Sequence, residues 1–134
     1  MSESSKDMAK AGSFGLKLRF RAPRGIYSGD LAALVVEAVR SMGSEVERRR
    51  ALIGHIKVYL TVPGGSLKVN LVDVGLGPEK EDALPPGTVD QGEIRFMAAL
   101  VGVTDHEVEH LIEESLEPLQ EKLEVDILEH KHEH

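Results

Sequence analysis

Residues 54–71 read GHIKVYLTVPGGSLKVNL, and this stretch decides the fold class. Apolar and polar residues alternate through 54–62 and again through 67–71, which is typical of half-buried strands. The intervening PGGS segment, 63–66, predicts a hairpin connection. We therefore expect two neighbouring antiparallel strands with one face turned to a core.

Other segments upstream and downstream carry their own apolar periodicity. Residues 14–22 and 93–103 alternate as strands do, and apolar positions between Leu31 and Val46 recur at helical spacing. Ser28 or Asp30 is a candidate N-cap for that helix. A second helix is expected from Thr104 or Asp105, and Pro118 kinks it or starts a new turn.

The element order is thus strand, helix, three strands, helix. It predicts an α/β (α+β) fold, a two-layer sandwich in which a four-stranded mixed sheet carries two helices on one face. The other face is left open to solvent or a partner. Residues 75–92, rich in Gly and Pro, are expected to form a long loop.

The 134 residues suffice for one domain. We expect a disordered N-terminal segment at 1–13, a single domain at 14–128 and a His-rich C-terminal tail at 129–134. There is no cysteine, which excludes a disulfide scaffold and thiolate metal sites. No apolar run is long enough for a transmembrane helix, and residues 1–13 lack the apolar core of a secretory signal, so a cytoplasmic location is the expectation.

The net charge of −7 hides an asymmetry between the two halves of the chain. Residues 14–74 carry a charge of +5, whereas residues 75–134 carry −12. Such a split indicates two faces with different partners, or one half that docks onto another copy. The acidic whole disfavours nucleic-acid binding, where phosphate contacts dominate the affinity.

Alternation places a set of mostly basic side chains on the open sheet face. The set is Lys17, Arg19, Arg21, His55, Lys57, Tyr59, Lys68, Asn70 and Arg95. These residues predict a surface for a protein partner or for self-association. The alternative is a small anionic ligand or a nucleic acid. An RNA-binding sheet would present two or three aromatic residues, and Tyr59 is the sole aromatic residue of this set.

Residues 106–110, HEVEH, match the H-E-x-x-H motif of zinc proteases. However, the apolar face formed by Val108, Leu111 and Ile112 lies on the opposite side of the helix from His106 and His110. A catalytic zinc also needs a walled pocket, and the chain has no second lobe to build one. The sequence therefore disfavours a zinc hydrolase.

Weak metal binding is a separate hypothesis. His106 and His110 lie one helical turn apart, and His130, His132 and His134 alternate near the C-terminus. Imidazoles at these spacings can chelate nickel, cobalt or zinc in open, fast-exchanging sites. Such sites suit metal handover or storage.

Other enzyme templates are missing. The chain has no P-loop, no G-x-G-x-x-G fingerprint and no G-x-S-x-G elbow. Carboxylates are abundant, but they follow a helix surface where nothing tunes them for acid–base catalysis. We expect no enzymatic activity.

The stretches LIGHIKVYL (52–60) and GGSLKVNLVD (64–73) resemble the C-terminal accessory domain of CobW-type metallochaperone GTPases. In element order the likeness covers about residues 30–115. It implies a docking module that works beside a GTPase in transition-metal handling. The family's P-loop and Cys-x-Cys-Cys motif have no counterpart here, so GTP hydrolysis and thiolate binding are not implied. Only His55 and Lys57 match the shared motif by position.

Overall fold

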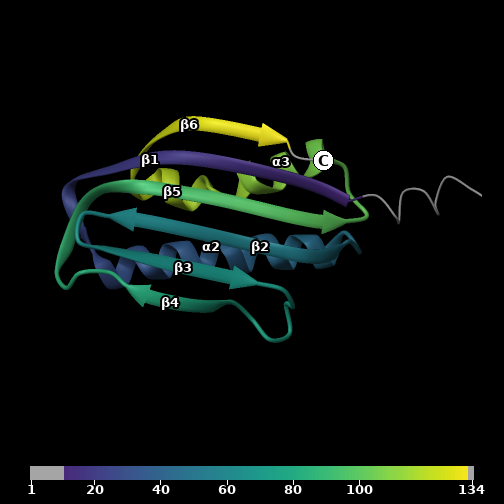
Figure 1. The fold of residues 1–134 in the computed structure, drawn as a ribbon, viewed down its shortest axis with the longest axis horizontal. Coiled ribbons are helices and arrows are strands. Elements are labelled where there is room, and N and C mark those ends of the chain that lie inside the picture. The colour runs from purple at the N-terminus through teal and green to yellow at the C-terminus, as the bar shows by residue number, and fades with distance from the viewer. Residues whose placement is uncertain (1–10, 133–134) are drawn as a thin grey trace, which may run out of the picture.

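The computed structural model describes residues 11–132, with side chains from 12 to 128. A six-stranded sheet has the order β4-β3-β2-β5-β1-β6, and all neighbouring strands are antiparallel (Figure 1). The strands are β1 (Ala11–Tyr27), β2 (Leu52–Val62), β3 (Gly65–Leu71), β4 (Glu79–Ala83), β5 (Thr88–Val101) and β6 (Glu124–His132).

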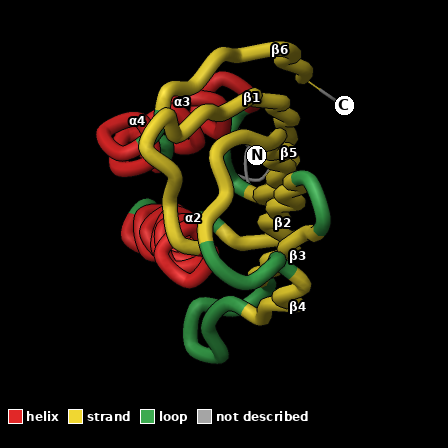
Figure 2. The backbone as a smooth tube through the Cα atoms, turned by 90° about the vertical axis from the view of Figure 1, so that its left-hand side faces the viewer, coloured by secondary structure: helices red, strands yellow, loops and turns green. Residues whose placement is uncertain are grey.

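The helices are α2 (Ser28–Arg48), α3 (Asp105–Ser115) and the short α4 (Glu117–Lys122). All three lie on the same side of the sheet, so the opposite face is open (Figure 2). The expected two-layer arrangement of an α+β fold with one open sheet face is therefore confirmed. None of the helices in the described part of the chain is long and apolar enough to cross a membrane.

The core lies between the helices and the inner face of the sheet. Leu18, Phe20, Phe96 and Leu100 are fully buried on that face, as the alternation predicted. Val35, Val39 and Met42 of α2 pack onto it at helical spacing. Every second residue of the strands and every third or fourth residue of the helix is buried in one shared core, and this burial stabilises both kinds of element.

Glycine at position 43 lets α2 approach the sheet closely. A Cβ there would lie 2.4 Å from Leu71 Cδ2 and 3.4 Å from Val74 Cγ2. The residue that weakens the helix in isolation therefore permits its packing.

The strand number and sheet type differ from the prediction. The sheet has six antiparallel strands and is not a mixed sheet of four. β5 inserts between β1 and β2 and runs antiparallel to both, which makes β1 and β2 parallel without pairing them directly. Strand order depends on which distant segments pair, and the apolar periodicity of a single segment contains no information about its partner.

Three boundary predictions are also wrong. The expected loop at 75–92 contains β4 and the start of β5. β1 begins at Ala11 and continues past the expected stop at Pro23–Gly25 to Tyr27, with a register shift between Arg21 and Ile26. β6 includes residues 129–132 of the expected tail.

The start of α2 differs from the expected capping. Its N-cap is Tyr27, and no side chain caps the helix. Instead Ser28 Oγ donates to the Pro85 carbonyl at 2.5 Å, and Ser28 N–H donates to the Gly87 carbonyl at 2.9 Å. These bonds hold the β4–β5 connection against the helix. Pro118 stands in the first turn of the separate helix α4, so it starts a new helix.

Candidate functional site

One row of outward-facing positions runs straight across the sheet. The β3–β2–β5–β1 register places Lys68 opposite Tyr59, Tyr59 opposite Arg95 and Arg95 opposite Lys17. At the β4 edge the row continues to Glu81, which is opposite Lys68. Because neighbouring strands lie about 4.8 Å apart, side chains in this row are within reach of one another.

This face is hollowed around the row, with a volume of about 750 Å³. Its lining comes from five strands, β1 to β5. The lining residues are Lys17, Lys57, Val58, Tyr59, Thr61, Lys68, Val69, Asn70, Glu79, Lys80, Glu81, Glu93, Ile94, Arg95 and Met97. We call this depression the sheet-face hollow.

Tyr59 stands near the middle of the sheet-face hollow and is 38% exposed. Lys68 Nζ lies 5.6 Å from the centroid of its ring, in a cation–π arrangement. Arg95 of β5 is opposite Tyr59, and Lys57 lies two residues before Tyr59 on the same strand, β2. The phenol is thus surrounded by three cationic residues.

Most of these cations lack a carboxylate partner. Lys17 Nζ lies 3.7 Å from Glu93 Oε1, which partly neutralises it. In the described part of the chain, Lys57, Lys68 and Arg95 form no ion pair. Five cationic and three anionic residues line the sheet-face hollow, so it has a positive excess on an acidic protein.

Asn70 contributes a polar atom without a partner. Its Oδ1 is buried and accepts no hydrogen bond from any described residue. A buried acceptor left unsatisfied costs about 1–3 kcal/mol. Asn70 also lines the sheet-face hollow, so a ligand donor that reached this oxygen would recover that cost.

Three predicted face residues lie outside the sheet-face hollow. Arg19 is opposite Glu93 on β5 and Asp126 on β6, and Arg21 is opposite Glu124. β6 therefore brings acidic residues beside the β1 cations. His55 pairs with Ala99 beyond the lining residues. Burial and, second, the charge of Lys57 lower the pKa of His55 below its ordinary 6.5.

Other lining residues were not predicted as site residues. Glu79, Lys80 and Glu81 come from β4, whose five residues are all exposed and carry no apolar alternation. Glu93 and Met97 lie on the predicted strand and face outward, but neither is basic. The apolar–polar alternation of this strand would have been enough to place Glu93 and Met97 on the open face.

The HEVEH segment lies at the start of α3, and both of its histidines are exposed. Thr104 and Glu107 form a capping box, so this glutamate serves the helix start. His110 Nε2 lies 3.3 Å from Glu114 Oε1, and Arg49 Nη2 of the α2 C-cap lies 3.8 Å from the same oxygen. The second histidine thus belongs to a solvent-exposed network between the two helices.

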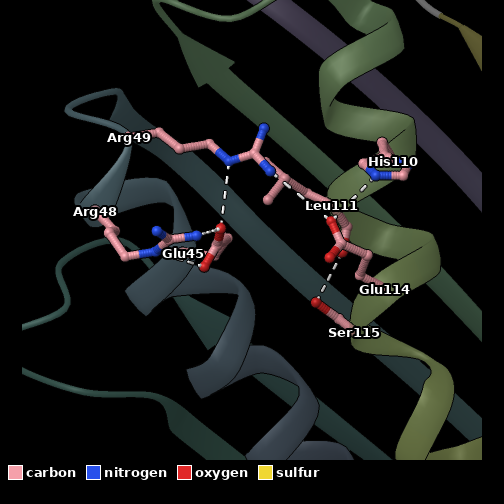
Figure 3. Close-up of polar contacts among 7 residues, drawn as sticks. All are labelled: Glu45, Arg48, Arg49, His110, Leu111, Glu114 and Ser115. Atoms are coloured by element: carbon pink, nitrogen blue, oxygen red, sulfur yellow. Dashed lines mark hydrogen bonds and ion pairs between the residues drawn. The ribbon is translucent and has the colours of Figure 1, made fainter.

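That network continues along α2 through Glu45 (Figure 3). Its carboxylate accepts hydrogen bonds from Arg48 and Arg49. The Arg48 bond is the main cause that lowers the pKa of Glu45, and the same bond raises the pKa of Arg48. These contacts join helices and do not shape a catalytic pocket.

The other predicted metal ligands are only partly described. The backbones of His130 and His132 belong to β6, where they pair with Leu16 and Phe14, and His134 lies outside the described residues. Among the described residues, no group of three or more His, Cys, Asp or Glu is arranged to hold a metal ion. Metal binding therefore stays a prediction.

No protein-family model matches the chain, and no similar curated protein was found. The resemblance to the CobW accessory domain thus stays an expectation from residues 52–60 and 64–73.

Proposed function

We propose that this protein is a non-enzymatic binding module that holds a small anionic ligand in the sheet-face hollow. The single observation that carries the proposal is the grouping of Lys57, Lys68 and Arg95 around Tyr59 without a carboxylate partner. Lysine and arginine in such a group form short, charge-assisted hydrogen bonds to phosphate or carboxylate oxygens. The phenol hydroxyl adds a neutral donor.

The size of the hollow also supports a small ligand. Its volume of about 750 Å³ falls inside the range of about 300–1,000 Å³ that small-molecule sites occupy. The register already fixes the backbone positions of these cations, so only their side chains have to be ordered when the ligand arrives.

Calorimetric titration of methyl phosphate at low salt tests this function. We expect binding to the wild type, and at least tenfold weaker binding to Arg95→Ala, because one charge-assisted contact is lost. Arg24→Ala is the matched control, since it removes the same charge from an exposed residue outside the hollow. Absence of binding, or equal loss in both variants, would contradict the proposal.

Docking of a protein partner is the second candidate. The exposed side chains of Tyr59 and Met97 favour it, because aromatic residues and methionine are enriched in interfaces. The CobW resemblance suggests a GTPase as the partner, and a second copy is the other option. Sedimentation of the wild type beside Tyr59→Ala tests self-association: a dimer that becomes a monomer in the variant would support docking.

Weak binding of nickel, cobalt or zinc remains a further proposal. His106 and His110 are both exposed and one turn apart on α3. Two imidazoles at that spacing chelate without any pocket. Such a site would act in metal handling, independently of the sheet-face hollow.

A further inference from the structure

Acceptors and cations lie on different strands in one row of the sheet-face hollow. Glu79 of β4 is opposite Asn70 of β3, and Asn70 is opposite Lys57 of β2. The two lining carboxylates without an ion pair in the described part of the chain, Glu79 and Glu81, are both on β4, whereas the carboxylate of Glu93 on β5 lies 3.7 Å from Lys17. The cations Lys68 and Lys80 also line the hollow on β3 and β4. A ligand with an anionic group near Lys57 and Arg95 and neutral donors on the β4 side fits this arrangement.

The acceptors are not satisfied by the protein. Glu81 is opposite Lys68 on β3, yet the Lys68 ammonium lies over the Tyr59 ring and forms no ion pair among the described residues. Glu79 likewise has no cationic partner there. Asn70 Oδ1 is shielded from water, so a donor that reaches it displaces no hydration from that atom.

The donors that suit this side are neutral. An ammonium group there would meet carboxylates but also the nearby ammonium groups of Lys57 and Lys68, which repel it. Hydroxyl groups can donate to Glu79, Glu81 and Asn70 and accept from the lysines. A flat base is less suitable, because Lys68 already covers one face of the Tyr59 ring.

We infer that the ligand is a phosphate ester of a polyhydroxylated carbon chain or ring, that is, a sugar phosphate. Its phosphate lies between Lys57 and Arg95, and its hydroxyl groups face Asn70 and Glu81. This inference rests on the proposed anion-binding function and names the ligand class of that same site.

The test compares ribose 5-phosphate with methyl phosphate by calorimetry on the full chain at pH 7.5. Both carry the same phosphate, so the ratio of their dissociation constants isolates the hydroxyl contacts. We expect the wild type to bind ribose 5-phosphate at least tenfold more tightly. In Asn70→Leu and in Glu81→Ala the ratio should fall to about threefold or less.

Asp82→Ala is the matched control, since Asp82 lies on the same strand, carries the same charge and does not line the hollow. It should keep the wild-type ratio. Equal binding of the two esters to the wild type would overturn the sugar-phosphate inference and leave anion binding intact. A ratio unchanged in Asn70→Leu and Glu81→Ala would overturn the assigned contacts. Binding of neither ester would overturn the proposed function itself.

Discussion

Gly92 marks a point where β1, β2 and β5 approach too closely for any side chain. A Cβ at this position would lie 2.4 Å from the Thr61 carbonyl oxygen, and 2.7 and 2.9 Å from Phe20 Cε1 and Cζ. Ordinary contact begins at 3.4 Å, so Thr61 would have to retreat by about 1 Å. Gly92→Ala therefore creates a clash with two neighbours at once.

Neither neighbour can yield easily. Phe20 is fully buried, and Thr61 is paired on both sides, with β3 and β5. Overpacking in such surroundings costs about 1–3 kcal/mol, and two simultaneous contacts place this variant at about 2–3 kcal/mol. Thr61 and Glu93 also line the sheet-face hollow, so the displacement should reach its floor.

Urea unfolding followed by circular dichroism measures the effect as a lower free energy of unfolding. Gly29→Ala is the control, because nothing lies within 4 Å of a Cβ there and the residue is in the first turn of α2. It should be neutral or stabilising, by up to about 1 kcal/mol. A Gly92→Ala protein as stable as the wild type would refute the packing described for β1, β2 and β5.

Three further predictions concern His55, the capping of α3 and the two histidines of α3. The lowered pKa of His55 means that the unfolded chain takes up its proton first as the pH falls. Stability should therefore decrease from about pH 6.5 downward and level off below the folded-state pKa, and His55→Gln should lose this component in urea titrations across that window. Thr104→Ala removes the capping box of α3 and should lower the free energy of unfolding by about 1 kcal/mol, whereas Thr104→Ser should retain most of it. If α3 chelates metal, replacement of both His106 and His110 by alanine should weaken Ni²⁺ binding at least tenfold in calorimetry; an unchanged affinity would place any metal elsewhere.

Side-chain alternation explains how much of the fold the sequence predicts. The inner positions of β1, β2, β3 and β5 are buried as expected, because each strand turns one face to a shared core. The same reasoning does not predict β4 and β6, because both are edge strands of the sheet. The EKEDA sequence of β4 has no apolar alternation, and charged edge strands are a common protection against unwanted pairing.

The candidate site follows the same division. Alternation places Lys57, Tyr59, Lys68 and Arg95 on the open face, and the register brings them together. The acceptors Glu79 and Glu81 belong to β4, which pairs with β3. The sequence of β4 has no apolar alternation, so this strand and its pairing could not be predicted. The unpartnered oxygen of Asn70 depends on packing, so no sequence pattern could reveal it.

The place where an anion binds decides directly whether the sheet-face hollow is a ligand site. Backbone amide chemical shifts, recorded by two-dimensional NMR during a titration with methyl phosphate, report the site residue by residue. We expect saturable shifts clustered at Lys57, Tyr59, Lys68 and Arg95, with α3 unaffected. Shifts centred on α3, or no saturable shifts anywhere, would contradict this expectation.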